Sequence, residues 1–110
     1  MDNSPFNAPA PKALDLLLSR RSGSAKAMTD PGPSPAELDA ILKAAARVPD
    51  HGKLFPWRFI VFEGDARARA GQLLVDALAA TEKMTDERTA SESVRLLRAP
   101  VVVAVVSRVR

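Results

Sequence analysis

Apolar residues early in the chain repeat at the spacing of an α-helix. Leu14, Leu17 and Leu18 fall at positions i, i+3 and i+4, which places them on one helical face. We expect this helix to begin near Pro11 and to end within residues 20–23, where a glycine can stop it. The pattern therefore predicts a short amphipathic helix at the start of the ordered chain.

The residues before this helix contain prolines that are incompatible with a regular helix or a central strand. They are Pro5, Pro9 and Pro11. We therefore expect residues 1–11 to be a flexible arm and residues 12–110 to belong to one domain.

The clearest helix start in the chain is the sequence Ser-Pro-Ala-Glu at residues 34–37. Ser34 can cap free backbone N–H groups, Pro35 suits the first helical position because it lacks a donor, and Glu37 can complete a capping box. We expect the helix to end near residues 47–48 because Pro49 cannot continue it. Its apolar face consists of Leu38, Ile41, Leu42 and Ala45.

Two stretches have the pattern of β-strands. Residues 57–63 alternate between two largely apolar faces, and residues 101–106 are continuously apolar. The second stretch should lie at the centre of a sheet and be buried on both faces. A central strand needs a neighbour on each edge, and the chain offers one other convincing strand. Either a second copy supplies the rest or the 110 residues are an incomplete domain, and we favour the incomplete domain.

Two further helices are predicted between the strands. After a turn at Gly64 and Asp65, residues 66–81 form the third helix. The fourth follows a polar stretch and should end at residues 97–98, because Pro100 breaks it. The predicted buried side of the third helix consists of Leu73, Leu74, Ala77 and Leu78. Helices and strands together indicate an α+β fold.

The composition excludes several kinds of chemistry. The hydrophobic fraction of 46% and charged fraction of 26% are those of an ordinary globular protein. The sequence has no Cys, which excludes disulfide scaffolds, thiol catalysis, iron–sulfur clusters and cysteine zinc sites and favours a reducing cytoplasm. One His leaves little for a metal site, so we predict none.

The charge balance fits an anionic ligand. Sixteen Lys and Arg against thirteen Asp and Glu give a net charge of +3. Aromatic residues are 5% of the chain and Tyr is absent, so base-stacking platforms are hard to build, and a basic nucleic-acid-binding module is the weaker alternative. No apolar run approaches the ~20 residues of a membrane-spanning helix, and no export signal is recognisable. We expect a cytoplasmic protein with neither membrane nor nucleic-acid partners.

Arginine side chains are the best candidates for ligand binding. No G-x-G-x-x-G follows a predicted strand and no G-x-x-x-x-G-K-[ST] occurs, so the usual glycine cradles for phosphates are missing. Arg20, Arg21 and Ser22 close the first helix, where their guanidinium groups can bind a phosphate or simply complement the helix dipole in water. Arg47 and His51 form a second candidate pair beside Pro49, with the same two readings open.

In order, these segments resemble the nitroreductase family of FMN-dependent oxidoreductases, in particular its small branch with a Pro-Asp-His loop. Leu-Leu-x-Arg-Arg-Ser stands at residues 17–22, the capped helix follows, Arg-Val-Pro-Asp-His stands at 47–51, and Pro-Trp-Arg-Phe-Ile-Val stands at 56–61. The match covers residues 12–65 well and 66–107 loosely. It implies an α+β fold with a nitroreductase-like mixed sheet flanked by helices.

The resemblance also implies a site. Arg20, Arg21 and Ser22 of one chain are expected to bind the FMN phosphate and ribityl chain, while Arg47 and His51 reach the flavin bound mainly by the other subunit of a homodimer. NAD(P)H would donate hydride to the flavin, which would reduce an electron-poor acceptor such as a nitroaromatic or quinone. No side chain is expected to act as a catalytic residue, because the cofactor performs the redox chemistry.

Two departures from the family pattern bear on the prediction. Many members have Gln or Asn before Pro-Trp, whereas this chain has Phe55, which cannot hydrogen-bond the flavin ring. Family chains also continue beyond the second predicted strand. A non-catalytic truncated fragment of the same fold is therefore the alternative to an active oxidoreductase.

Overall fold

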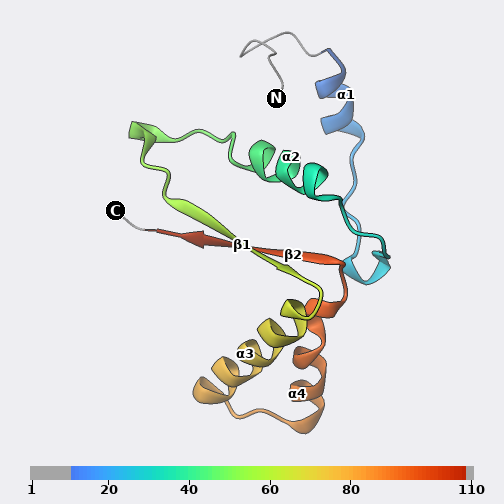
Figure 1. The fold of residues 1–110 in the computed structure, drawn as a ribbon, viewed down its shortest axis with the longest axis vertical. Helices are drawn as coiled ribbons and strands as arrows, with labels where there is room; N and C mark the ends of the chain where they lie inside the picture. The colour runs from blue at the N-terminus through green and yellow to red at the C-terminus, as the bar shows by residue number, and fades with distance from the viewer. Residues whose placement is uncertain (1–10, 109–110) are drawn as a thin grey trace.

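The computed structural model describes residues 11–108, and its elements follow the predicted order (Figure 1). The helices are α1 (Pro11–Ser19), α2 (Pro35–Ala45), α3 (Ala66–Thr81) and α4 (Asp86–Ser93). The strands are β1 (Trp57–Glu63) and β2 (Val101–Ser107). Three short 3₁₀ turns stand at Ala25–Ala27, His51–Lys53 and Arg95–Leu97. The α+β class is confirmed, and the proposed arm lies outside the described residues except for Pro11, which begins α1.

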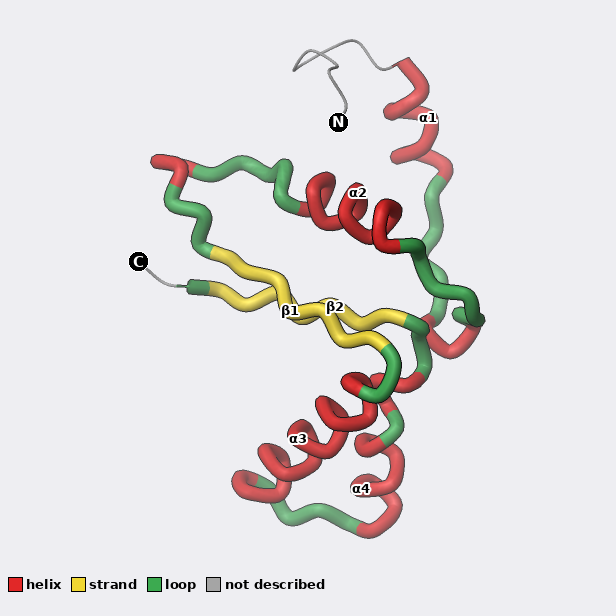
Figure 2. Tube along the Cα trace, in the orientation of Figure 1, coloured by secondary structure: helices red, strands yellow, loops and turns green. Residues whose placement is uncertain are grey.

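The two strands form an antiparallel ladder that runs through the middle of the structure (Figure 2). Its register joins Trp57 to Ser107 at one end and Glu63 to Val101 at the other. The Arg108 N–H extends the ladder by donating to the Pro56 carbonyl at 2.6 Å. In this view α2 lies on one side of the ladder, and the α3–α4 pair lies on the other.

β2 is less covered than its apolar sequence predicts. Burial on both faces was expected, but none of its residues is buried and Val105 is 67% exposed. The reason is that, within residues 11–108, β2 has one neighbouring strand and packed elements cover little of its surface. The strand itself is confirmed, and its predicted central place in a sheet is not reproduced by the described part of the chain.

Packing in α3 differs from the hydrophobic pattern. Gly71 and Val75 are the buried residues of this helix, whereas Leu73 is 69% exposed and Ala77 is also exposed. Of the predicted buried face, Leu74 and Leu78 are half-buried. The prediction was wrong for the other two because α4 packs where the side chain of α3 is smallest, at Gly71, rather than against the leucine-rich face.

The turn from β1 into α3 is tied to the segment before β2 by one arginine. Arg67 donates from Nη1 to the Ala99 carbonyl at 2.6 Å and from Nε to the Gly64 carbonyl at 3.1 Å. Its guanidinium therefore binds two carbonyl oxygens at the end of the ladder, which offsets its unfavourable place near a helix N-terminus. Arg67 therefore holds the β1–α3 turn against the segment that leads into β2, next to the α3–α4 pair.

Helix boundaries depart from the prediction in α1, α2 and α4. α1 ends at Ser19, ahead of the expected residues 20–23, so Arg20, Arg21 and Ser22 follow the helix. α2 ends at Ala45, two residues early, because the chain tightens and the Arg47 N–H donates to the Ala44 carbonyl at 3.1 Å. α4 begins after Thr85, whose hydroxyl accepts from the Arg88 N–H at 3.1 Å. It ends at Ser93 rather than at residues 97–98, and a separate 3₁₀ turn follows before Pro100.

Few side chains are removed from water. Val75, 6% exposed, is the buried hydrophobic residue of the described chain, and the Cα radius of gyration is 17.8 Å. A compact domain of about 100 residues has a radius near 13 Å. α1 and α2 lie outside the packed set formed by the ladder, α3 and α4, so their apolar faces are largely exposed. No helix within residues 11–108 is both long and apolar enough to cross a bilayer.

The capping box at the start of α2 is confirmed. The Ser34 hydroxyl accepts from the Glu37 N–H at 3.1 Å, and the Glu37 carboxylate accepts from the Ser34 N–H at 2.9 Å. The backbone hydrogen bond, together with the side-chain bond, lowers the pKa of Glu37 from its ordinary value of 4.5. The carboxylate's contribution is therefore complete above pH 4.5 and is lost as the pH falls through the lowered value.

Ser34→Ala should weaken α2 locally, because this helix packs little and depends on its caps. The lost cap costs about 1 kcal/mol, which corresponds to roughly a fivefold fall in amide exchange protection over α2. Ser91→Ala, at an exposed serine without a capping role, is the matched control and should leave protection unchanged. Equal protection in wild type and Ser34→Ala at neutral pH would contradict the capping role.

Candidate functional site

The turn after α1 exposes two guanidinium groups. Arg20 donates from Nη2 to the Ser22 hydroxyl at 2.9 Å, and Arg21 donates from Nη1 to the Arg20 carbonyl at 2.9 Å. All three residues are exposed, and no ion pair within residues 11–108 involves either arginine. Most of their N–H donors therefore remain available to an anion, and the serine hydroxyl lies in the same cluster.

A second cluster is built by the loop between α2 and β1. The carboxylate of Asp50 accepts the N–H of Leu54 at 3.2 Å and the N–H of Phe55 at 3.0 Å. Gly52, Lys53 and Phe55 have φ angles of 78°, 51° and 47°, in the left-handed region. The loop is thus folded tightly around one half-buried carboxylate.

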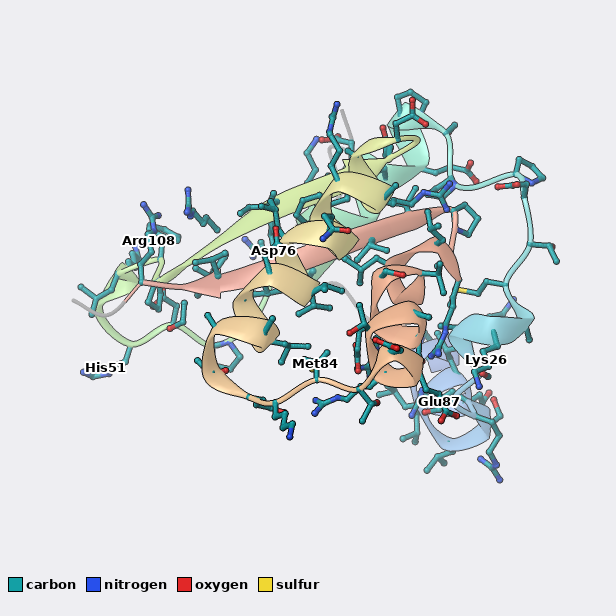
Figure 3. The ribbon with its side chains drawn as sticks, turned by 90° about the horizontal axis from the view of Figure 1, so that it is seen from below. Lys26, His51, Asp76, Met84, Glu87 and Arg108 are labelled. Carbon is teal, nitrogen blue, oxygen red and sulfur yellow. The ribbon has the colours of Figure 1, made fainter. Side chains whose placement is uncertain are left out.

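His51 stands at the tip of this loop and points away from the body of the structure (Figure 3). It is exposed, as is Lys53 two residues later. Arg108 lies at the same end of the molecule and donates from Nη2 to the Trp57 carbonyl at 3.4 Å. The pairing of Trp57 with Ser107 brings the Arg108 guanidinium next to the loop, a placement that the sequence does not predict because it depends on the strand register.

Two adjoining clefts open between the end of α2 and the start of β1. Their volumes are about 470 and 640 Å³, and they share Arg47, Phe55 and Trp57 as lining residues. The rings of Phe55 and Trp57 meet edge to face, with centroids 6.1 Å apart and planes at 79°. Lys53 lines the smaller cleft and Lys43 the larger one. Aromatic surface next to cations suits a planar anionic ligand.

The structure keeps the two groups of predicted site residues apart. Arg20, Arg21 and Ser22 follow α1, whereas His51 belongs to the loop at the far end of α2 (Figure 1). Arg47 lines both clefts, and His51 lines neither. One chain therefore presents two separate cationic surfaces.

Sequence reasoning treated Asp50 only as part of the Pro-Asp-His signature. Asp is a common turn residue whose carboxylate can bind backbone N–H groups, but the usual bond is to the residue two positions on. The bonds to Leu54 and Phe55, four and five positions on, have no such local signal. From the sequence, Phe55 is notable only because its side chain cannot make the hydrogen bond to flavin that Gln or Asn could make. Its left-handed backbone and its contact with Trp57 were not predicted.

These features define an α+β protein that relies on arginine side chains, rather than a glycine-rich cradle, for candidate anion binding. The model of the nitroreductase family matches residues 17–110. The chain belongs to the nitroreductase family, as its motifs indicate.

Curated relatives agree with this assignment. A Haemophilus influenzae protein named "Putative NAD(P)H nitroreductase" is 37% identical over 97 residues, which cover 88% of this chain and 51% of that protein. The Escherichia coli K12 protein named "Putative NAD(P)H nitroreductase YdjA" is 36% identical over 99 residues, which cover 87% of this chain and 51% of that protein. The chain spans about half the length of the curated relatives it matches.

Proposed function

We propose that the protein is an FMN-dependent oxidoreductase that takes hydride from NAD(P)H and reduces an electron-poor acceptor such as a nitroaromatic or quinone. The observation that carries the proposal is the exposed turn of Arg20, Arg21 and Ser22, which resembles the Arg-Arg-Ser turn of the family and lies within the residues that the family model matches. The names of the relatives, which mention NAD(P)H and nitro reduction, support the same class of reaction.

The donor set of this turn fits the phosphate of FMN. Guanidinium groups bind phosphate oxygens through parallel N–H bonds, and both arginines have donors left over after their contacts within the turn. The Ser22 hydroxyl already accepts from Arg20, and its own proton remains available to a phosphate or ribityl oxygen. The turn can therefore hold a dianionic group without a glycine cradle.

Arg47 and His51 are proposed to reach the flavin from the partner subunit of a homodimer. Arg47 and His51 follow the far end of α2, whereas the Arg20 turn follows α1 (Figure 1). This separation within one chain supports a site completed by two chains. Positive or hydrogen-bond-donating groups there would stabilise negative charge on the flavin ring. The exposed apolar residues of α1, which include Leu14, Leu17 and Leu18, supply surface that association can bury.

FMN bound at this site supplies the two-electron redox chemistry, while the side chains of this chain bind, orient and shield it. Phe55 contributes an aromatic edge against Trp57 where many family members have an amide side chain. We therefore propose that apolar contact, rather than a hydrogen bond, is made from this position. The absence of Cys makes a reducing cytoplasm the proposed location.

Anaerobic assays with NADH and NADPH test the proposal. The protein as its gene encodes it should oxidise one of the two only when FMN is present, and a nitroaromatic or quinone should sustain turnover. FMN binding without any oxidation of either nucleotide would favour the non-catalytic alternative, as would FMN binding by a longer chain but not by the 110 residues alone. Salt-sensitive binding to nucleic acid without FMN binding would favour the basic module instead.

A further inference from the structure

The loop from Asp50 to Phe55 adopts a conformation that its sequence does not favour by itself. Lys53 and Phe55 have side chains with a Cβ, yet both lie in the left-handed region, at φ 51° and 47°. Residues with a Cβ, apart from Asn and Asp, seldom occupy this region because the Cβ approaches the backbone oxygen. Gly52 takes the third left-handed position without this penalty. Something outside these residues must hold the conformation.

The carboxylate of Asp50 supplies that restraint. Oδ1 accepts the N–H of Leu54 at 3.2 Å, and Oδ2 accepts the N–H of Phe55 at 3.0 Å. Both bonds span Gly52 and Lys53, and the second ends at the N–H of Phe55. Both have a charged acceptor, which makes them stronger than bonds between neutral groups. Because each carboxylate oxygen receives one backbone donor, the side chain is oriented toward the loop backbone.

The position of this loop decides how the second cationic surface is arranged. Phe55 emerges from it to meet Trp57 and to line both clefts with Arg47. Lys53 lines the smaller cleft together with Asp50. His51, at the tip, immediately follows the anchoring residue. A loop released from the carboxylate would move these groups together relative to β1.

We propose that Asp50 is a positioning residue for cofactor binding, which holds His51 and Phe55 in the arrangement that the cofactor meets. The inference rests on the proposed function. Asp50 acts through the loop and takes no part in proton or hydride transfer. Without its carboxylate, only a fraction of molecules would have the competent loop, and the apparent affinity for FMN would fall by that fraction.

The test is FMN affinity, followed by quenching of flavin fluorescence, in the protein as its gene encodes it. Asp50→Ala should raise the apparent Kd by roughly tenfold, the effect of losing stabilisation comparable to one charge-assisted hydrogen bond. Asp50→Asn should have a smaller effect, because the amide keeps one acceptor oxygen but turns a donor toward the second N–H. Asp76→Ala, which removes an exposed carboxylate that accepts from Gln72 on α3 and lines neither cleft, is the matched control and should bind FMN normally.

A second change separates positioning from a general loss of structure. Lys53→Gly added to Asp50→Ala should recover part of the lost affinity, because glycine takes a φ of 51° without a Cβ penalty. Amide exchange should show lost protection at Leu54 and Phe55 in Asp50→Ala, with the α3–α4 pair unchanged. A residue needed only for global stability would lower protection throughout and would not be rescued at Lys53.

Each outcome decides the question. Wild-type FMN binding together with unchanged binding in Asp50→Ala overturns the inference and leaves the proposed function standing. Affinity lost in parallel with global unfolding, without rescue by Lys53→Gly, also overturns it. A wild-type protein that does not bind FMN overturns the proposed function and the inference with it.

Discussion

Replacing Arg20 or Arg21 with Ala is expected to weaken FMN binding by roughly 10- to 100-fold for each arginine, because a hydrogen bond to a charged group contributes about 1.5–3 kcal/mol. Both guanidinium groups are exposed and outside the ion pairs of the described chain. Their removal therefore costs the protein little by itself. The loss should appear in FMN affinity, measured by fluorescence quenching, and not in the unfolding transition.

The matched control for these variants is Lys26→Ala, which removes another exposed positive charge a few residues later, in the Ala25–Ala27 turn. It changes the net charge by the same amount, so it measures the general electrostatic effect. Arg20→Lys and Arg21→Lys add a second comparison, because an ammonium keeps the charge but cannot bind phosphate as a fork. Equal losses in Lys26→Ala and in the arginine variants would contradict a specific phosphate site.

Gly71→Ala is expected to destabilise the α3–α4 pair by about 1–3 kcal/mol, the usual cost of overpacking. A Cβ at this position would meet the Ser93 carbonyl oxygen at 2.6 Å, and the obstacle is backbone at the end of α4. At an uncrowded helix position, the same exchange gains about 1 kcal/mol from helix propensity. Because the two helices approach so closely here, the exchange is expected to lower the stability of the protein instead of raising it.

Urea unfolding of Gly71→Ala measures this effect, with Gly23→Ala as the control because a Cβ there meets nothing within 4 Å. The control should be neutral or slightly stabilising. Amide exchange should place the loss in α3 and α4, with α2 unaffected because it lies outside that packed set. A Gly71→Ala protein more stable than wild type would contradict the helix crossing seen here.

Local rules in the sequence predicted the elements well. The capping box at Ser34, the alternation of β1 and the apolar run of β2 each depend on neighbouring residues, and all three elements formed where expected. The bounds of α3 also agree with the prediction. These signals are short-ranged, so they can be read without knowing the fold.

Features that depend on contacts between residues far apart in the sequence could not be predicted from local patterns. The buried face of α3 is set by Gly71 against α4, which no periodicity reveals, and Leu73 is exposed as a result. The contacts of Arg108 with Pro56 and Trp57, just after the Asp50 loop, depend on the strand register. Asp50 and Gly52 indicate a turn, but neither the bonds from Asp50 to Leu54 and Phe55 nor the left-handed Phe55 follow from these residues.

For the site, the sequence predicted the candidate residues but not their arrangement. The motifs named Arg20, Arg21, Ser22, Arg47 and His51, and the family assignment is confirmed. Their roles toward FMN remain predictions. The structure adds that the first three follow α1, whereas Arg47 lines both clefts at the end of α2 and His51 stands outside them at the loop tip. Phe55 and Trp57 form an aromatic wall beside Arg47. The family resemblance implies a site completed by two subunits, and this separation within one chain is consistent with that proposal.

We propose that the protein is a flavoprotein whose phosphate site is the Arg20–Ser22 turn. Titration of the protein, as its gene encodes it, with FMN tests this most directly. We expect saturable quenching of flavin fluorescence that persists in Lys26→Ala and is lost when Arg20 and Arg21 are both replaced with Ala. Absence of saturable binding in the wild type, or equal affinity in the double variant, would contradict it.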